Sequence, residues 1–438
     1  GTTTVATGAG IAITKWSNKL SFMVGRAPTT LSTLTGPMPT QEKSQRLIEP
    51  NASSQTMPVL RVDELWKGRG DRVKVHCGQI AKFVVVMGDE NAEGRGPGLD
   101  FSTQELLLNL ATLPISAGGE MSQQRTDFDL RSDAMFQLKA GMPRFRWQRA
   151  LVHMAGARGK NDGQDWILPA NTATGPDARL ASYMVNTVLA PSYNRHWVVS
   201  AGTLVQGGAQ LASILSTDVM RLSVVDELAA TLSELAIRMA PIKIDDDPAA
   251  EDDPISGIFY MDPLVYDNFI TDPTAGGNIR RWQADAGDRA KFGNLQAHPL
   301  FAGKAMLWNN ILIRKMYFPI RFDAGDSVAH ITVGNRYTAT ETNVTVNSIG
   351  SNFQVARSIF ISAQALALVN GGDRLANETY SLLEKHTDNF GRDHQYAGQV
   401  MGSESKFRWG FPSGSTGTLE PTDFGCAVID SVVRKRVN

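Results

Sequence analysis

A helical pattern from Arg125 to Gly159 constrains the fold more than any other part of this chain. Apolar residues recur there mainly at spacings of three and four, the pattern of one buried helix face: Phe128, Leu130, Ala134, Met135, Leu138, Phe145, Leu151 and Met154. Thr126 and Asp127 can cap the start, and Gly156 can end the helix. About 28 helical residues would span roughly 40 Å, which suits an elongated subunit.

Two residues interrupt this pattern, Gly141 and Pro143. A proline inside a helix removes one backbone donor, and its ring clashes with the carbonyl four residues earlier. We therefore expect a kink or two abutting helices, and we take Gly141 and Pro143 as a candidate hinge.

The segment before the helix divides into two parts. Residues 1 to about 60 hold scattered Thr, Ser, Gly and Pro with little periodicity, which predicts either a disordered segment or an arm that becomes ordered on a neighbouring molecule, the arm being favoured if the protein assembles. Strands are then predicted at Arg72–Val75, at Phe83–Val86 and, returning, at Leu106–Leu110. The glycine-rich sequence GDENAEGRGPG lies between them, so we expect a long projecting hairpin that needs a partner surface.

The second half mixes helices and strands, which indicates an α+β fold. A helix is predicted over residues 219–240, with Asp218 as its cap and Pro241 as its end. The sequence GIFYMDPLVYDNFITD predicts a strand followed by a helix, and Trp282–Phe292 predicts another helix. Strands are expected around residues 306–315, 331–356 and 405–433, whereas the apolar run Phe360–Val369 fits either a buried helix or a strand.

Composition and motifs argue against an enzyme. The 43 basic and 44 acidic residues nearly cancel, which is not the charge balance of a nucleic-acid-binding protein. The sequence contains no phosphate-binding loop, nucleophile elbow or zinc-binding helix, and its seven histidines lack metal-ligand spacing. Two cysteines and the lack of a long apolar run favour a non-secreted protein without a membrane segment. We expect no cofactor and no metal.

Several motifs, in their order along the chain, resemble the major capsid proteins of phages related to coliphage N-four. The resemblance covers roughly residues 15 to 435, and its clearest motifs are VDELWKGRGDRV, GDENAEGRGPGL, GGEMSQQRTDFDLRSDA, LVHMAGARG, HPLFAGKAMLWNNILIRKM, FISAQALALVNGG, DHQYAGQVMGSESKFRW and DFGCAVIDS. It implies the tailed-phage capsid fold named after phage Hong Kong 97. Such a fold has an N-terminal arm, an extended loop, a peripheral domain with a long spine helix, and an axial domain.

This resemblance implies a division of the chain into five parts. They are an N-terminal arm (1–60), the extended loop and its stem (61–118), a peripheral domain with the spine helix (119–200), an axial domain (201–400), and a C-terminal return to the peripheral domain (401–438). At the loop, Arg69, Glu93 and Arg95 are candidates for ion pairs between subunits.

The function expected from this resemblance is structural. Copies would assemble into hexamers and pentamers of an icosahedral head that encloses double-stranded DNA without sequence specificity. Expected partners are other copies, a portal, scaffolding proteins and decoration or cement proteins, with assembly in the bacterial host cytoplasm. An encapsulin-like compartment shell and an unrecognised α/β enzyme remain as alternatives.

Overall fold

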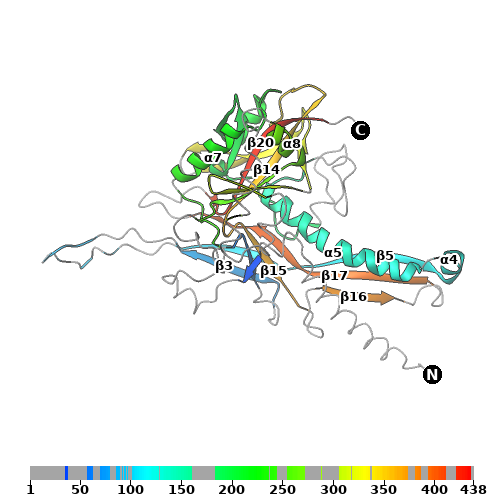
Figure 1. The fold of residues 1–438 in the computed structure, drawn as a ribbon. Coiled ribbons are helices and arrows are strands. Elements are labelled where there is room, and N and C mark those ends of the chain that lie inside the picture. The colour runs from blue at the N-terminus through cyan, green and yellow to red at the C-terminus, as the bar shows by residue number, and fades with distance from the viewer. Residues whose placement is uncertain are drawn as a thin grey trace.

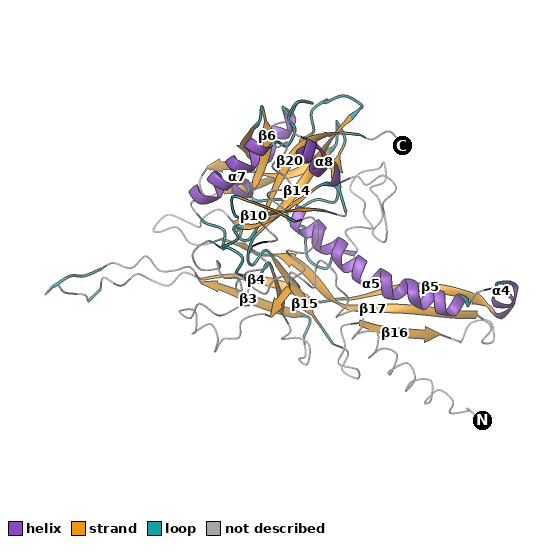
Figure 2. Cartoon of the chain, in the orientation of Figure 1, coloured by secondary structure: helices purple, strands orange, loops and turns teal. Residues whose placement is uncertain are grey.

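The computed structural model of this chain describes residues 35–37, 57–62, 70–78, 85–88, 91, 93–94, 96, 101–127, 129–159, 183–235, 237–243, 254–271, 288, 305–316, 318–335, 338–372, 380–385, 393–410 and 421–435. Within these residues, two sheets are joined by one long helix, α5 (Figure 1). The β3–β4 hairpin extends from the body on one side, and α5 with its underlying strands extends on the other (Figure 2).

The upper sheet has eight strands in the order β7-β6-β20-β14-β8-β10-β9, with β11 paired to β14. Helices α7 and α8 contribute to the apolar cluster on one face, which includes Trp197, Phe259 and Phe360. The bounds are β6 (His196–Ser200), β7 (Thr203–Gln206), α7 (Leu222–Glu234), β8 (Gly257–Met261), α8 (Pro263–Thr271), β9 (Met306–Trp308), β10 (Ile311–Lys315), β11 (Ile320–Phe322), β14 (Phe353–Ile361) and β20 (Cys426–Arg434).

The other face of the upper sheet is covered by three elements. A second apolar cluster there joins Leu151 and Met154 of α5 to Leu211 and to Val328. These residues come from the C-terminal end of α5, the short helix η2 (Gly208–Ala212), and the hairpin of β12 (Ser327–Asn335) and β13 (Thr338–Thr345). Residues from distant parts of the sequence therefore share one core.

The lower sheet has six strands in the order β1-β2-β15-β17-β16, with β5 paired to β17. Strand β17 is central because it pairs antiparallel with β15, β16 and β5. The remaining hairpin, β3–β4, forms a separate two-stranded sheet beside it. The bounds are β1 (Thr35–Pro37), β2 (Val59–Val62), β3 (Arg72–Gly78), β4 (Phe101–Leu107), β5 (Leu110–Gly119), β15 (Leu366–Asn370), β16 (Tyr380–Lys385) and β17 (Asp393–Lys406).

The predicted long helix is α5 (Leu130–Ala155), which runs through Gly141 and Pro143 as one helix of 26 residues. Of the two alternatives expected, two abutting helices are not found, because packing along the helix outweighs the bond that proline removes. The kink and the hinge stay predictions. The cap of the helix is Asp129, whose side chain accepts from the Arg131 backbone N–H at 3.0 Å, and not Thr126 or Asp127. A separate short helix, α4 (Glu120–Arg125), precedes it.

Gly156 ends α5 as predicted, with a φ of 66° in the left-handed region. A Cβ atom at this position would lie 2.7 Å from the carbonyl oxygen of Leu189, so the chain also passes too closely for any side chain. The end of the helix is therefore fixed both by backbone conformation and by packing.

The prediction for residues 219–240 was right in type and wrong in extent. Helix α7 ends at Glu234, before Pro241, and it begins after Arg221 without a side-chain cap. Asp218 is buried and accepts instead from the backbone N–H groups of Ala201 and Leu215, at 2.9 and 2.8 Å. Its carboxylate thus stabilises two nearby turns, a use that local sequence does not reveal.

Other local predictions had mixed outcomes. The strand and helix predicted from GIFYMDPLVYDNFITD are β8 and α8, and the ambiguous run from Phe360 to Val369 contains the end of β14 and most of β15. Val85 and Val86 are not in a strand, and residues 83 and 84 of the strand predicted at Phe83–Val86 lie outside the described residues. The predicted helix at Trp282–Phe292 lies outside the described residues, apart from position 288.

Candidate assembly surface and the joint that supports it

The outer part of the lower sheet, together with α4 and the first half of α5, forms a projection that we call the limb. Strands β5, β17 and β16 lie side by side in it, and α5 packs on one face. Ala134, Leu138 and Met142 of α5 contact Tyr396 and Val400 of β17. Gly398 permits this close approach, since a Cβ atom there would lie 2.8 Å from the Met142 sulfur.

The opposite face of the limb sheet is weakly apolar. Strand register places Pro114, Ala397 and Leu383 in one row across the three strands, and Leu110 opposite Met401 in another. Thr112 and Gln399 lie between these rows. Leu110 and Leu383 are 44% and 42% exposed. None of these seven residues is charged, and depletion of charge is typical of surfaces that become covered on association. Strand register places a charged residue, Lys385, in the next row of the same face.

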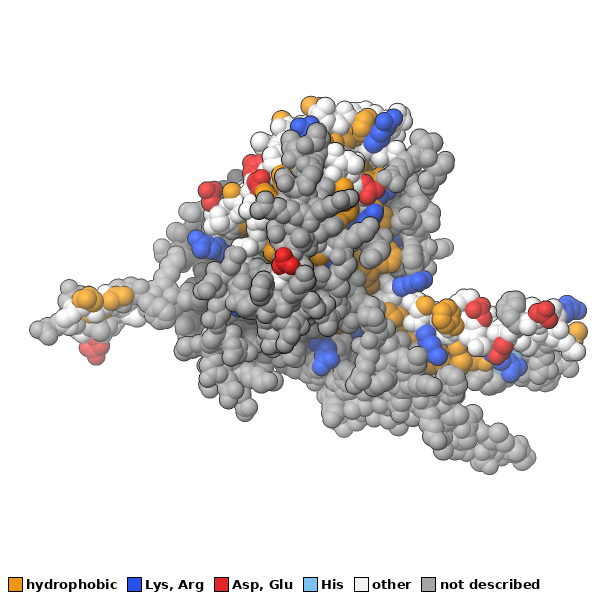
Figure 3. Space-filling view, in the orientation of Figure 1, with side chains coloured by type: hydrophobic (Ala, Val, Ile, Leu, Met, Phe, Trp, Pro, Cys, Tyr) orange, Lys and Arg blue, Asp and Glu red, His pale blue; other side chains and the backbone are white. Residues whose placement is uncertain are grey.

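Further apolar side chains are exposed at the two ends of the molecule. Phe136 on α5 is 68% exposed and lines a shallow hollow with Asp129, Ser132 and Asp133. Val85 and Met87, in the loop beyond the β3–β4 hairpin, are 76% and 74% exposed. Hydrophobic side chains are visible on the outer surface of the limb and at the end of the opposite projection (Figure 3).

The base of the β3–β4 hairpin is firmly seated on the body. Val73, Val75 and Leu106 pack into an apolar cluster with Phe407 and Trp409, whose rings stack at 5.6 Å. The Gln104 side chain donates to the carbonyl of Lys406 at 2.9 Å and accepts from the Arg408 backbone N–H at 3.1 Å. The hairpin therefore leaves the body in a defined direction.

The candidate contact residues are only partly described. Glu93 is exposed in the loop, where its backbone N–H donates to Asn91 Oδ1 at 3.0 Å, and it forms no ion pair within the described part of the chain. Arg69 and Arg95 lie outside the described residues. Gly141 and Pro143 lie midway along α5. Among the described candidates, Glu93 therefore lies in the loop beyond the β3–β4 hairpin, and Gly141 and Pro143 lie in α5.

Three networks of buried charge, which we call the joint, connect α5 and the two sheets. The first is centred on Glu404 of β17. Arg146 Nε donates to Glu404 Oε1 at 2.9 Å, and Arg149 Nε lies 2.8 Å from Oε2. Arg146 also donates to Asn370 Oδ1 of β15 at 2.7 Å. Burial alone would raise the pKa of Glu404, but Arg149 and Arg146 hold that pKa below its usual value.

The second network, centred on Asp430 of β20, lies inside the upper sheet. Arg357 of β14 donates from Nε and Nη2 to the two carboxylate oxygens, at 2.8 and 2.7 Å, and from Nη1 to the carbonyl of Ala155 at 3.0 Å. His196 Nε2 lies 2.8 Å from Asp430 Oδ2. All three charged or polar side chains are fully buried, and Arg357 ties the last residue of α5 to the sheet.

The third network is centred on Asp423, in the short strand β19 (Thr422–Asp423) that pairs with β18 (Arg408–Trp409). Lys406 Nζ lies 2.8 Å from Asp423 Oδ2, and Arg408 Nε lies 2.7 Å from Oδ1. The Ser192 backbone N–H also donates to Oδ2 at 3.0 Å. Burial alone would raise the pKa of Asp423, but Lys406 and Arg408 hold this pKa at about 2.

The joint was missed in the sequence, although a signal for it was present. Arg357 and Asp430 interrupt runs of β-branched and apolar residues in strands that are otherwise fully buried. Arg146 and Arg149 similarly lie in the most apolar half of α5. A charge within a buried run requires a partner, but sequence alone does not identify which residue supplies it.

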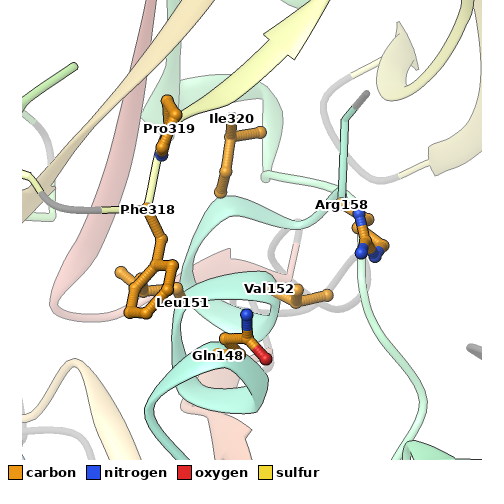
Figure 4. A pocket seen from close by; sticks show the side chains of 7 residues that line it. All are labelled: Gln148, Leu151, Val152, Arg158, Phe318, Pro319 and Ile320. Carbon is orange, nitrogen blue, oxygen red and sulfur yellow. The ribbon is translucent and has the colours of Figure 1, made fainter. Parts of the chain in front are cut away.

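A small pocket beside the joint has no chemistry of its own. Residues of α5 and the segment leading into β11 line it (Figure 4): Gln148, Leu151, Val152, Arg158, Phe318, Pro319 and Ile320. The described residues of the lining include no carboxylate, histidine, cysteine or hydroxyl group.

Two further findings bear on other classes of protein. No helix in the described residues is long and apolar enough to cross a membrane. The same part of the chain contains no group of three or more His, Cys, Asp or Glu side chains that could hold a metal ion.

The architecture is that of solved phage capsid proteins. The capsid of Ralstonia phage GP4 matches it with a TM-score of 0.64 at 21% identity, over 88% of this chain and 90% of that one. The cyanophage Pam1 capsid matches with a TM-score of 0.55 at 10% identity, over 88% of this chain and 91% of that one. The acid-stable capsid of Helicobacter pylori bacteriophage KHP30 matches with a TM-score of 0.53 at 10% identity, over 92% of this chain and 90% of that one.

The family follows from the sequence itself. The model of the phage capsid protein family matches residues 4–435, so this chain belongs to that family. No curated protein matches it. The chain is thus a phage major capsid protein, and the match favours neither an encapsulin-like compartment shell nor an enzyme.

Proposed function

We propose that copies of this protein form the hexamers and pentamers of an icosahedral head that encloses double-stranded DNA. The observation that carries the proposal is the pair of opposed projections with exposed apolar side chains, Val85 and Met87 on one and Leu383 and Phe136 on the other. Such side chains are stabilised when neighbouring copies cover them. A shell assembled through both projections would combine many individually weak contacts.

We propose a domain layout of the Hong Kong 97 type, with boundaries adjusted to sheet membership. The N-terminal arm (1–60) and the extended loop with its stem (61–118) stay as expected from the sequence. Strands β15, β16, β17 and β5 belong to one sheet, the sheet on which α5 packs. This supports placing residues 366–406 in the peripheral domain with residues 119–200. The pairing of β20 with β14 supports placing the C-terminal strand in the axial domain.

The arm and the extended loop would each lie across a neighbouring copy. The apolar row of Pro114, Ala397 and Leu383 on the limb sheet supports such a contact, because a neighbour could cover this row without desolvating a charge in it. We propose that Arg69, Glu93 and Arg95 form ion pairs between subunits at the loop. An Arg95→Glu variant is then expected to lower assembly yield and shell stability, and an unchanged shell would remove these ion pairs from the proposal.

The spine helix would bend at Gly141 and Pro143 as the shell matures. A proline in mid-helix supports this proposal, since the missing backbone bond locally weakens the helix. Pro143→Ala is expected to alter the extent or rate of shell expansion, followed by electron microscopy. An identical expansion in the variant would contradict the hinge while leaving the capsid function intact.

We further propose a portal, scaffolding proteins, and decoration or cement proteins as partners. The packaged DNA would be contacted without sequence specificity, which is consistent with the near-neutral composition of 43 basic and 44 acidic residues. Assembly would take place in the cytoplasm of the bacterial host, and the final location is the virion capsid.

Electron microscopy of the protein expressed alone, after size-exclusion chromatography, tests self-assembly. Closed shells, sheets or capsomer rings are expected. Monodisperse monomers would lead to co-expression with the scaffolding and portal genes of the same phage. Monomers in that experiment as well would overturn the proposal.

A further inference from the structure

One run of the extended loop has the composition of a strand, yet its described residues lie outside any strand. Residues 83–86 read FVVV, and aromatic and β-branched residues favour strands. Val85, Val86 and Met87 nonetheless have no strand conformation, and the side chains of Val85 and Met87 are 76% and 74% exposed. In an extended backbone these two side chains lie on the same face. The run therefore favours a strand and has an uncovered apolar face.

The limb sheet is one strand narrower at β16 than at β15. Both strands pair antiparallel with β17, β15 with residues 402–406 and β16 with residues 395–400. The outer edge of β15 is covered by β2, in register from Val59 to Val62. No strand among the described residues pairs with the outer edge of β16, which forms the lower margin of the limb (Figure 2). The sheet therefore has an open strand position beside β16.

The opposite edge of the limb sheet is protected by its sequence. Strand β5 forms this edge, and Pro114 lies in its middle, paired with Ala397 of β17. A proline cannot donate a backbone hydrogen bond, so it is typical of edge strands that do not accept another strand. Strand β16 has the sequence YSLLEK, without a proline. Of the two limb edges, β16 is thus the one suited to accept a further strand along its whole length.

We propose that the loop run containing Val85, Val86 and Met87 of a second copy adds as a strand to the outer edge of β16. This inference rests on the proposed assembly of copies and names the contact that the extended loop makes. Two copies are needed, because the loop and the limb extend from opposite sides of one molecule (Figure 2). Backbone hydrogen bonds join the two strands, and side chains on alternate positions fit the two faces.

The alternation of the loop run matches the two faces of β16. Leu382 lies on the face covered by α5 and is 3% exposed, whereas Leu383 lies on the open face and is 42% exposed. In the added strand, Val85 and Met87 lie on the open face, and Val85 extends the apolar row that contains Leu383 by one strand. Val86 then lies on the side of α5, beside Leu382. The added strand is therefore apolar on both faces where it meets the middle of β16.

Proline substitution at two neighbouring positions tests strand addition. Successive N–H groups of a strand point alternately toward its partner and away from it. Val85→Pro and Val86→Pro are therefore expected to differ: one removes a hydrogen bond to β16 and lowers the yield of assembled shells about tenfold, and the other is tolerated. Shell yield is measured by electron microscopy and size-exclusion chromatography.

The controls for this pair are Val85→Ala and Val86→Ala, which keep both N–H groups. Each is expected to lower the shell yield less than the disruptive proline does. Denaturant titration of the subunit is expected to show unchanged folding in all four variants, because these positions lie in the loop beyond the β3–β4 hairpin. Equal yields from the two proline variants would contradict strand addition.

Cysteine cross-linking of assembled shells identifies the partner strand. Val85→Cys is combined in turn with Ser381→Cys, Leu383→Cys or Lys385→Cys, positions that strand register places on the open face of β16. Mild oxidation is expected to link two copies in at least one of these combinations. The control combines Val85→Cys with Leu215→Cys, an exposed position on the upper body, and is expected to give no such dimer. Each single variant controls for the two natural cysteines.

The outcomes separate this inference from the proposed function. Shells of normal yield without a dimer in any of the three combinations would overturn strand addition at β16 and leave the capsid function intact. Equal cross-linking in the control with Leu215→Cys would also contradict it. Absence of shells from the unmodified protein, even with its scaffolding and portal proteins, would overturn the proposed function and with it this contact.

Discussion

Arg357 and Asp430 are fully buried in the joint, whereas Leu383 and Phe136 are substantially exposed on the limb. The joint thus contains charge where water is excluded, and the limb contains apolar surface where water has access. Both arrangements are unfavourable unless each group finds a partner. In the joint, the partners are present within one copy of the chain; on the limb, they would come from neighbouring copies.

This difference indicates how the two regions contribute to a shell. The joint connects α5, β14, β17 and β20 through specific donor and acceptor pairs, so it fixes the direction of the limb before any neighbour arrives. On the limb, the apolar row of Pro114, Ala397 and Leu383 has no donor or acceptor side chains to direct a partner. Correct assembly would therefore depend on orientation set at the joint and on burial gained at the limb.

The largest expected effect comes from removing a carboxylate in the joint. Asp430→Asn leaves Arg357 buried without its counter-charge, and the free energy of unfolding is expected to fall by about 3–5 kcal/mol. Denaturant titration of the soluble protein measures this loss.

Glu105→Gln is the matched control, because Glu105 pairs with Arg72 at 3.0 Å on the surface. The free energy of unfolding of Glu105→Gln is expected to fall by no more than about 1 kcal/mol. Equal losses in the two variants would show that burial of the joint does not distinguish its ion pairs from those on the surface.

A smaller effect is expected from acid acting on Asp423, whose pKa is lowered from 3.8 to about 2. The folded protein holds this carboxylate ionised more strongly than the unfolded chain does, so its contribution is present above pH 3.8 and is lost as the pH falls toward 2. The contribution amounts to about 2 kcal/mol. Denaturant titration across this pH range measures it.

Asp423→Asn serves as the comparison for this pH dependence. The variant is expected to be less stable than the original protein at pH 6 and to show a shallower decline in acid, because Asp430 and Glu404 still titrate. Parallel declines for the two proteins would show that Asp423 does not contribute in this range.

The smallest effect on the isolated subunit is expected on the limb. Leu383→Lys places a charge in the apolar row of Pro114, Ala397 and Leu383, and subunit stability is expected to change by no more than about 0.5 kcal/mol, because the site is open to water. Assembly, however, is expected to fail or weaken strongly. Electron microscopy and size-exclusion chromatography measure this outcome.

The matched control on the upper body is Leu215→Lys, since Leu215 is 57% exposed. Normal shells are expected from it. Equal loss of assembly in both variants would contradict the proposal that the limb sheet face forms the contacts between copies.

Sequence patterns predicted those parts of the fold that depend on neighbours along the chain. The periodicity of Ala134, Leu138 and Phe145 predicted α5, and Gly156 predicted its end. The alternation at Arg72–Val75 predicted β3 of the projecting hairpin. The prediction failed for Asp218, whose carboxylate accepts from the backbone of Ala201 and Leu215 and does not cap α7. Two abutting helices are not formed at Pro143, because packing along the whole helix keeps it as one.

The sequence by itself determined the family, the long helix, the projecting hairpin and the near balance of charge. These features follow from local periodicity, turn residues and composition, which act over a few residues at a time. Only the tertiary structure decided that Glu404 meets Arg146 across 258 positions and that Arg357 meets Asp430 across 73. It likewise decided that Leu383 and Pro114 share an open face, because strand register is a property of paired segments and not of either segment alone.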